Sequence, residues 1–380
     1  MNQNIKRLLY ALAVIAIVLG IYGFASRLLF GERDVNYGSY INWGLWVAMY
    51  LFFAGLAAGS FMVASLDYLF DVKLFKGTGR YALWGTIVTL PAALLLIGFD
   101  LGHMERIWKV YLEPNLSSLL AQLVWSYTIF FIVTLVALAL AMRGQGAWLK
   151  GVMVIGLALA LFVSGGVGAL LGVNAGQTSF HTAMLPAQFP ILNLMSGVAL
   201  MTVFVGLFNV VEPERRERLL RVLGLSLVGL LTVKAYFLWV DYSQVLYSNV
   251  TDAVAVADTI LFGQFSWAFW GLQIVLGLIV PFILFLWPGS ARLPLWAAVG
   301  GILVLLGLAV GRTAIIFPQL AVPDLTGLAE AFTGPGLTFE YTPSLMEWSV
   351  VIGVLGLSTI VYLLGVDRLP LFKSRSEATA

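Results

Sequence analysis

The stretch NWGLWVAMYLFFAGLAAGSF, residues 42–61, contains no charged side chain. A helix needs roughly 20 predominantly apolar residues to cross the hydrocarbon core of a bilayer. Gly55 and Gly59 lie four positions apart in this stretch, and small residues at that spacing let two helices approach closely in lipid. The stretch therefore predicts a membrane-spanning helix that packs tightly against a second helix.

The rest of the chain has the same character. Of its 380 residues, 61% are hydrophobic and 11% are charged, less than half the charged share of about 25% in soluble domains. Ten apolar runs are long enough to span a membrane: 7–30, 41–66, 80–102, 119–142, 148–173, 187–211, 219–243, 260–287, 294–317 and 344–366. We therefore expect an all-α integral membrane protein, one polytopic domain over residues 1–380, with two four-helix bundles plus flanking helices.

The first run could be mistaken for a signal peptide, because Lys6 and Arg7 precede it. Its apolar part from Leu8 to Phe24 exceeds the roughly 7–15 residues of a signal peptide's apolar region, and no clear cleavage site follows. We expect a retained helix.

Lysine and arginine are distributed unevenly among the loops, and cytoplasmic loops of membrane proteins carry the excess of these residues. With ten helices, one side receives fifteen of the 21 basic residues: Lys6, Arg7, Lys73, Lys76, Arg80, Arg143, Lys150, Arg215, Arg216, Arg218, Arg221, Arg292, Arg368, Lys373 and Arg375. Both termini are therefore predicted to be cytoplasmic, and the loop after residue 102 extracytoplasmic.

The chain has no cysteine and two histidines, His103 and His181, both in predicted outer loops. Without cysteine it can hold no disulfide, no cysteine-ligated iron–sulfur cluster and no covalent c-type haem. Two histidines outside the helices cannot ligate a pair of b-type haems. The net charge of +2, with no strongly basic stripe, argues against nucleic acid. We expect no haem, no bound metal and no nucleic-acid partner.

Polar side chains within the apolar runs gather towards one face of the membrane. An ionisable group in a membrane span is costly and usually faces the bundle interior or a cavity, so each is a functional candidate. The predicted outer half contains Asn42, Tyr50, Asp100, Gln122, Tyr127, Asn174, Lys234, Asp241, Arg312 and Glu347, whereas Asp67 lies near the inner edge. Polar chemistry is therefore expected near the extracytoplasmic face.

Lys234 has almost only apolar neighbours in the sequence, and an unpaired ammonium group in hydrocarbon is costly. Two interpretations remain open. Lys234 forms a structural ion pair with Glu347 or Asp241, or it belongs to a proton route. The same alternatives, proton route or ion pairs, apply to Asp67 and Arg312.

The segment GFDLGHMERIWKVYLEPNLSS, residues 98–118, places Asp100 and His103 close to the predicted outer surface. A pocket of small residues, Tyr and Trp with a carboxylate and an imidazole at the water boundary suits a quinone, because quinol oxidation requires two proton acceptors. Asp100 and His103 could be those acceptors. The alternative is a helix cap and an interfacial anchor.

Two further features allow two interpretations each. The glycine-rich run SGGVGALLG, residues 164–172, indicates either close helix packing or a slot for a flat ligand. The loops 103–118 and 318–343 are longer than the others, and long ordered loops are usually functional. Residues 318–343 are either a surface loop with a short interfacial helix or a docking surface for an extracytoplasmic partner.

Several motifs resemble those of the NrfD/PsrC family, the membrane subunits of polysulfide reductase and related complexes. The stretch 42–61 resembles the family's W-G-x-x-I/V-x-x-Y/F…G-x-x-x-G pattern, and DLGHMERIWKVYLEPNLSSLLAQLVWSY (100–127) resembles D-L-G-R-x-x-R-F-W…P-N-x-x-S. LLGVNAGQTSFHTAMLPAQFPILNLMSG (170–197) is similar to the family's next loop and helix. YTPSLMEWSVVIG (341–353) resembles the Y-x-P-x-x-x-E motif of the ten-helix branch, which includes HybB-type hydrogenase and ActC-type alternative complex III subunits.

The resemblance implies a haem-free quinone-binding subunit whose first four core helices hold the quinone near the extracytoplasmic face. It implies an extracytoplasmic iron–sulfur partner with 4Fe–4S clusters, and behind it a molybdopterin, hydrogenase or multihaem catalytic subunit. Tyr50 stands where shorter members have a quinone-liganding histidine. Asp100 matches the family's acid, and His103 replaces its usual arginine. Gly166 replaces the usual tyrosine of the pattern Y-x-G-x-L-L.

The favoured interpretation is a subunit of a prokaryotic cytoplasmic membrane that passes electrons between menaquinone or ubiquinone and the iron–sulfur partner. Asp100 and His103 are the expected proton acceptors, and Tyr50, Asn42, Gln122, Tyr127 and Asn174 are expected to line the quinone site. Proton translocation could accompany the reaction. The alternatives are a proton-conducting or secondary transport module, and a membrane anchor whose quinone site has decayed.

Overall fold

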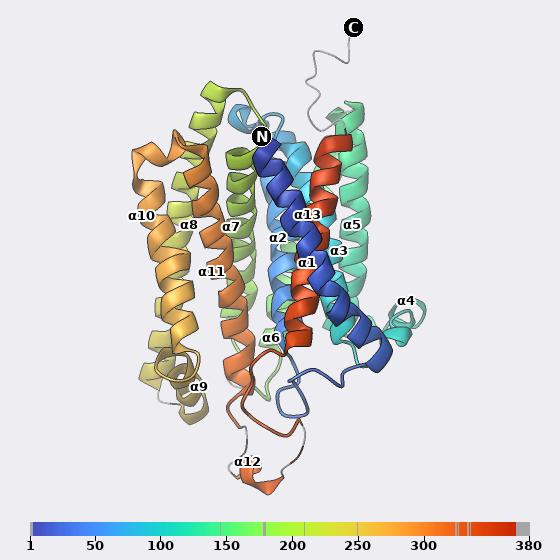
Figure 1. Ribbon diagram of the computed structural model, residues 1–380, viewed down its shortest axis with the longest axis vertical. Helices are drawn as coiled ribbons and strands as arrows, with labels where there is room; N and C mark the ends of the chain where they lie inside the picture. Colours follow the sequence, from blue (N-terminus) through green and yellow to red (C-terminus); the bar gives the residue numbers. More distant parts are fainter. Residues whose placement is uncertain are drawn as a thin grey trace.

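The computed structural model describes residues 3–369 apart from 145, 178–179, 209, 249, 324, 326, 333 and 335. Lys373 and Arg375, which belong to the predicted basic side, lie outside the described residues. Every regular element among the described residues is helical, and ten helices are long and apolar enough to cross a membrane (Figure 1). The predicted fold class and helix count are therefore confirmed.

The ten spans are α1 (Gln3–Phe30), α2 (Leu45–Tyr68), α3 (Gly79–Asp100), α5 (Leu119–Arg143), α6 (Gly146–Gly172), α7 (Met184–Leu207), α8 (Pro213–Ser248), η3 continued by α10 (Ala268–Ile279 and Val280–Leu286), α11 (Pro294–Leu320) and α13 (Leu345–Arg368). Shorter elements in the loops are η1 (Lys73–Phe75), η2 (Met104–Arg106), α4 (Lys109–Leu112), α9 (Thr251–Leu261), η4 (Pro288–Ala291) and α12 (Leu328–Ala331).

The spans pack as two groups of four with a flanking pair. One group contains α2, α3, α5 and α6, and the other contains α7, α8, η3 with α10, and α11. The flanking pair, α1 and α13, lies against α3, and Figure 1 shows α1 in blue crossing α13 in red. This arrangement agrees with the expected two bundles plus flanking helices.

Helix α2 lies at the centre of the molecule, because α3, α6, α7, α11 and α13 all contact it. Its apolar segment is entirely buried, which explains why its sequence is hydrophobic on every face. A side chain added at Gly59 would run into the backbone of Asn193 and Gly197 on α7, and one added at Gly55 would meet the Asn193 amide. The glycine spacing therefore serves close packing, as the sequence predicted, and it joins the two bundles.

The basic loops share one end of the molecule. Lys6 forms an ion pair with Asp367, so α1 begins beside the end of α13. Arg215, at the start of α8, donates hydrogen bonds to the backbone carbonyls of Lys73 and Leu74. The elements α4, α9 and α12 lie at the opposite end (Figure 1). That the basic end is cytoplasmic stays a prediction.

Several predicted boundaries were wrong. The run 260–287 is not one helix, because α9 ends at Leu261 and the next span begins at Ala268. The intervening turn, closed by the Phe265 amide bonding to the Thr259 carbonyl, consists mainly of apolar residues that hydropathy cannot separate from a helix. Helix α8 extends beyond 219–243 at both ends, because the charged residues from Glu214 to Arg218 continue its helical backbone at the start and Gln244 to Ser248 continue it at the end. Helix α11 extends to Leu320, which shortens the loop predicted from residue 318.

Asn42 was predicted to lie inside the second span. In the structure it is exposed and precedes α2, which begins at Leu45. The polar and glycine residues before Leu45 form a loop, so the predicted span from residue 41 begins four residues before the helix does.

Candidate functional site

A cavity of about 330 Å³ lies near the start of α5 and the end of α6. Its lining is apolar except for one amide side chain and consists of Leu119, Gln122, Leu123, Leu161, Phe162, Gly165, Gly166, Ala169 and Pro186. Leu161 and Phe162 are about half exposed on the outer surface of α6, so this cavity, the α5–α6 slot, borders the surface that lipid would cover.

Some glycines of the run 164–172 line the slot and others serve close helix packing, the two interpretations that the sequence left open. Gly165 and Gly166 face the α5–α6 slot, where the nearest atom to a methyl group at Gly165 would be the Pro186 carbonyl oxygen at 3.4 Å. Gly168 instead packs against the backbone of Leu185, where no side chain fits. The position at which the family usually has tyrosine, Gly166, is therefore part of the slot wall.

Gln122 is the polar residue of the slot. Its amide nitrogen donates a hydrogen bond of 2.8 Å to the Leu116 carbonyl, which fixes the amide plane. The oxygen of the same amide is a hydrogen-bond acceptor. The slot thus combines flat apolar walls with one oriented amide.

Tyr50 of α2 and Tyr127 of α5 meet below the slot. Their hydroxyl groups are 3.4 Å apart and their rings pack edge to face with centroids 6.3 Å apart. Both side chains are buried. Because Tyr127 follows Leu123 by four positions on α5, the two side chains share one face of that helix. The structure therefore brings together Tyr50 and Tyr127, and places them one helical turn from the slot lining.

Asp100 ends α3 in a different environment. Its Oδ1 atom is buried and has no hydrogen-bond partner among the described residues. Nearby, the Arg27 guanidinium donates hydrogen bonds of 2.7 Å to the carbonyls of Phe99 and Leu101, so it caps the end of α3. Burial, with the Asp100 carboxylate next in effect, raises the pKa of Tyr37 well above its ordinary value. Asp100 thus belongs to a polar cluster around Arg27 and Tyr37 at the end of the molecule opposite the basic loops.

His103 and Asn174 have other partners. The imidazole of His103 is exposed, and its Nδ1 lies 3.0 Å from the Glu105 carboxylate. A backbone hydrogen bond first, and the His103 side chain after it, lower the pKa of Glu105. Asn174 lies in the turn after α6, where its backbone amide bonds to the Leu171 carbonyl. The expected site residues are therefore distributed over several environments.

Asp67 has a structural role at the basic end. Its carboxylate accepts hydrogen bonds from the backbone amides of Gly77 and Gly79, at 2.8 and 2.9 Å. These amides precede and begin α3, where free N–H groups need acceptors. Asp67 thus caps α3 and forms no ion pair within the 4.0 Å limit among the described residues.

Glu347 is fully buried and holds three segments together. Its carboxylate accepts from the Ser344 amide at 2.8 Å, the Asn36 amide at 3.2 Å and the Leu45 amide at 3.4 Å. Tyr341 donates its hydroxyl proton to the same carboxylate and accepts a hydrogen bond of 2.8 Å from Leu45. The Y-x-P-x-x-x-E motif thus caps the start of α2 as well as α13.

The hydroxyl of Tyr341 is a donor over the physiological range, because burial and the neighbouring Glu347 raise its pKa well above the ordinary value. Gly44 makes this arrangement possible, since a side chain there would collide with Glu347 and Tyr341. The ion pair expected between Glu347 and Lys234 is absent from the described part of the chain, because backbone amides already occupy the carboxylate.

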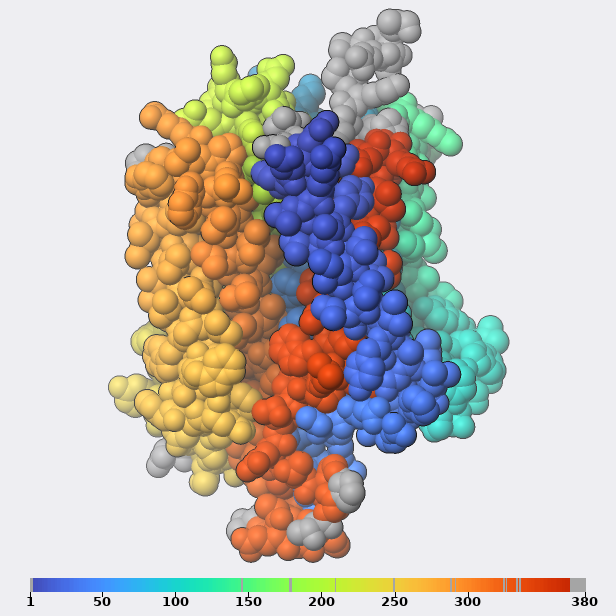
Figure 2. All heavy atoms as spheres, viewed as in Figure 1, coloured from blue at the N-terminus to red at the C-terminus, as the bar shows by residue number. Residues whose placement is uncertain are grey.

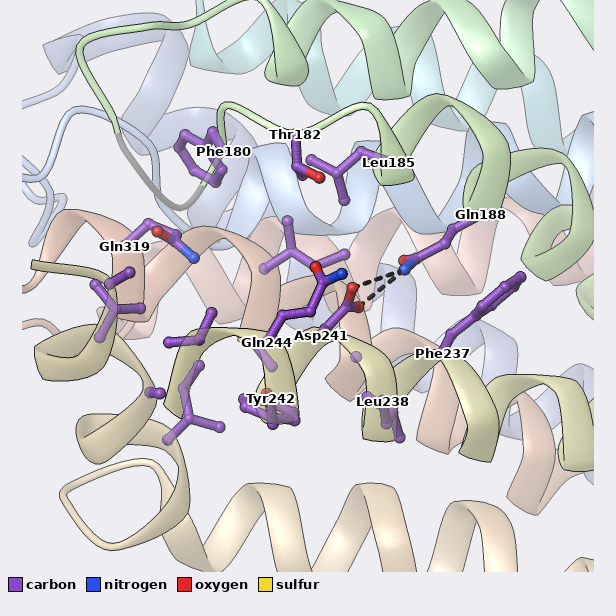
Figure 3. Close-up of a pocket in the computed structure, with 18 of the residues that line it drawn as sticks. Phe180, Thr182, Leu185, Gln188, Phe237, Leu238, Asp241, Tyr242, Gln244 and Gln319 are labelled. Carbon is purple, nitrogen blue, oxygen red and sulfur yellow. Dashed lines mark hydrogen bonds between the residues drawn. The ribbon is translucent and has the colours of Figure 1, made fainter. Parts of the chain in front are cut away.

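Lys234, Asp241 and Arg312 line one cavity of about 560 Å³ in the second bundle. Asp241 accepts two hydrogen bonds from the Gln188 amide, at 3.0 and 2.9 Å, drawn as dashed lines in Figure 3. Lys234 donates to the Gly307 carbonyl at 3.2 Å. The expected Lys234–Asp241 ion pair is absent among the described residues, because each group has a neutral partner.

Three uncharged amides were not among the predicted site residues. Asn193 of α7 accepts a hydrogen bond of 2.7 Å from Arg312 and donates one of 2.9 Å to Ser164 of α6. Gln188 and Gln273 are buried in the lining of the second-bundle cavity. Each amide interrupts an apolar run, so the rule applied to charged residues would have identified all three.

These features define a ten-helix integral membrane protein with an apolar slot in one bundle and a charged cavity in the other. The amino-acid sequence matches the family described as "Polysulphide reductase, NrfD" over residues 35–324. The chain belongs to this family, which confirms the resemblance found from the motifs. It is a multi-pass protein of a prokaryotic inner membrane.

Relatives of similar length support the assignment. A selenate reductase subunit of Mesobacillus selenatarsenatis is 28% identical, with 98% of this chain and 96% of the relative covered. The "Hdr-like menaquinol oxidoreductase integral membrane subunit" of Archaeoglobus fulgidus is 26% identical, with 97% and 94% covered. The "Menaquinone reductase, integral membrane subunit" of Nitratidesulfovibrio vulgaris is 23% identical, with 94% and 90% covered.

We expect the Glu347→Gln variant to be less stable than the native chain. A glutamine keeps the size but replaces one of the two acceptor oxygens by an N–H₂ donor, and each buried backbone amide left without an acceptor costs about 1–3 kcal/mol. The thermal midpoint of the purified chain in detergent should fall. Glu340→Gln, at an exposed loop position, is the control and should leave the midpoint unchanged. An unchanged midpoint for Glu347→Gln would show that the cap contributes nothing.

Proposed function

We propose that this chain is the quinone-reactive membrane subunit of an extracytoplasmic respiratory oxidoreductase complex. The observation that carries the proposal is the α5–α6 slot, whose wall lacks side chains at Gly165 and Gly166 and borders the lipid-facing surface. Family membership and the menaquinone or menaquinol named for two relatives support the class of ligand. Menaquinone is favoured over ubiquinone on those names.

The residues of the slot fit a flat ring. Side chains at Gly165 and Gly166 would fill the space, and the apolar walls match the ring faces. The Gln122 amide oxygen can accept a hydrogen bond from a quinol hydroxyl, and the half-exposed Leu161 and Phe162 flank an entry from lipid. A bound quinol would supply two electrons to the partner subunit and two protons to the outer water.

The proton path is assigned to groups of this chain. Tyr127 and Tyr50 form the hydrogen-bonded pair below the slot, and Asp100 has a carboxylate oxygen that can accept a proton. His103 is exposed at the same end, so we assign it the transfer of protons to water. Asn42 is exposed and Asn174 lies in a loop turn, so we assign neither to the ring itself.

The outer end is the proposed docking surface for the iron–sulfur subunit, with 4Fe–4S clusters and a molybdopterin, hydrogenase or multihaem subunit behind it. The loop that contains α12 projects beyond the helix ends in Figures 1 and 2. Leu325 and Phe332 in that loop are 67% and 63% exposed, and Leu112 at the end of α4 is 72% exposed. Exposed apolar groups of this kind suit a protein partner. The opposite, basic end would face the cytoplasm.

Filling the slot tests the proposal. We expect Gly165→Leu to reduce quinone-linked turnover of the purified complex by about tenfold or more, because the side chain would occupy the space of the ring. Gly151→Leu is the matched control, since a Cβ added at Gly151 on α6 meets no atom within 4 Å. Turnover with an artificial electron carrier that reacts at the catalytic subunit should be unchanged in both variants. Native quinone-linked activity in Gly165→Leu would exclude the slot.

Removing the charge of Asp100 tests the proton path. Asp100→Asn should lower quinone-linked turnover by about 100-fold, the lower range for loss of a general acid–base group, while the complex still assembles. Glu113→Gln, which alters an exposed carboxylate of the same loop that the proposed path does not use, should retain activity. Full quinone-linked activity of Asp100→Asn, measured as reduction or oxidation of a soluble quinone analogue, would remove Asp100 from the mechanism.

Proton translocation is a second candidate function, favoured by the cavity that gathers Lys234, Asp241 and Arg312. Quinone turnover by the complex in sealed liposomes should then move more protons across the membrane than the scalar reaction, the quinone chemistry alone, releases. The measurement is the lumen pH during turnover, with an uncoupler as control. A proton count equal to the scalar value would leave the chain as an electron-transfer subunit alone.

A further inference from the structure

The second-bundle cavity lies among α7, α8, α9, η3 and α11, and the proposed quinone reaction does not use it. In Figure 3 the Asp241 and Gln188 side chains meet, and Gln244 and Gln319 are drawn around the same space. The polar residues of its lining are His181, Thr182, Gln188, Lys234, Asp241, Tyr242, Gln244, Ser248, Gln273, Arg312 and Gln319. The cavity has a volume of about 560 Å³.

Arg312 lacks a charged partner within the described part of the chain. It is 3% exposed, and a guanidinium group does not lose its proton in proteins. Its partners are neutral: the Asn193 oxygen at 2.7 Å and the Phe189 ring, whose centroid is 4.0 Å away. The Nη1 atom is buried and has no hydrogen-bond partner among the residues described. A permanent charge in a membrane protein's interior requires more compensation than this.

Lys234 is a second cation of the same lining. It is 4% exposed, and its ammonium group donates to the Gly307 carbonyl. The one carboxylate among the described lining residues, Asp241, is held by the Gln188 amide and lies outside ion-pair distance of both cations. With both basic groups charged, the cavity carries two positive charges and one negative charge. A single additional negative charge would balance it.

The element η3 also contributes a side-chain amide to the lining. Element η3 is π-helical over 12 residues, and π-helical turns are frequent at functional sites. It places Gln273, 3% exposed, against Gly311 beside Arg312, and the Gln273 oxygen finds no hydrogen-bond partner in the described structure. That oxygen is an acceptor, so the group an anion would use is the Gln273 amide nitrogen, which forms no hydrogen bond among the described residues and lines the cavity with its N–H₂ donors.

We propose that this cavity binds one small inorganic monoanion of the halide class, held between Arg312 and Lys234 with the Gln273 amide as a further donor. The anion would neutralise the excess positive charge and leave Asp241 with Gln188. The proposal does not rest on the quinone reaction, so it can be tested in the isolated chain.

The test uses the full chain in detergent at constant ionic strength, with gluconate as the bulky reference anion. We expect radioactive chloride to bind saturably, at about one ion per chain, and bromide to compete. Replacing gluconate by chloride should raise the thermal midpoint of the native chain. Arg312→Gln and Lys234→Met should each weaken chloride binding by about tenfold or more, because each removes a buried charge that faces the ion.

Arg218→Gln is the control, since Arg218 is exposed at the basic end of α8. It should bind chloride like the native chain. Absence of saturable chloride binding to the native chain overturns the proposal, as does unchanged affinity in Arg312→Gln. If Arg312→Gln fails to elute as a monodisperse species in size-exclusion chromatography, the chloride affinity of Lys234→Met is measured in its place. Native chloride affinity in Lys234→Met also overturns the proposal.

Discussion

The close approach of α2 and α7 at Gly59 and Gly197 is the contact on which the rest of the structure depends. Neither backbone could approach the other if either glycine had a side chain. Because α2 belongs to the first bundle and α7 to the second, this crossing sets the position of one bundle against the other. It also brings Asn193 into reach of Arg312 from α11 and Ser164 from α6. A polar link between the bundles therefore depends on two missing side chains.

Much of the fold could be predicted because a lipid environment makes composition informative. The ten spans follow from apolar runs, since a spanning helix must satisfy its own backbone hydrogen bonds and expose apolar side chains. The gap between α9 and η3 could not be predicted, because Phe262 and Phe265 are apolar in a turn as they would be in a helix. The charged start of α8 was missed because an apolar run ends at the first charged residues, although the helical backbone continues through them.

The candidate site was less predictable, because side-chain partners come from distant segments. Glu347 was expected to balance a cation, yet its carboxylate binds the amides of Asn36 and Leu45, more than 300 positions earlier. Sequence identifies a costly carboxylate but does not reveal which donors surround it. The two interpretations of the glycine-rich run, close packing or a ligand slot, could not be separated for the same reason. Gly165 faces the slot and Gly168 faces the Leu185 backbone, and the sequence does not reveal what lies opposite each glycine.

The double cap made by Glu347 also constrains how the polypeptide reaches its folded state. The first amide of the central helix, that of Leu45, obtains its carboxylate from Glu347 of α13, which lies 302 positions later in the chain and is synthesised long after α2. Until that span has entered the membrane, the start of α2 lacks both this acceptor and the Tyr341 hydroxyl. Closure of the core is therefore a late event in biosynthesis, and a nascent chain interrupted before residue 341 leaves its most buried helix open at one end.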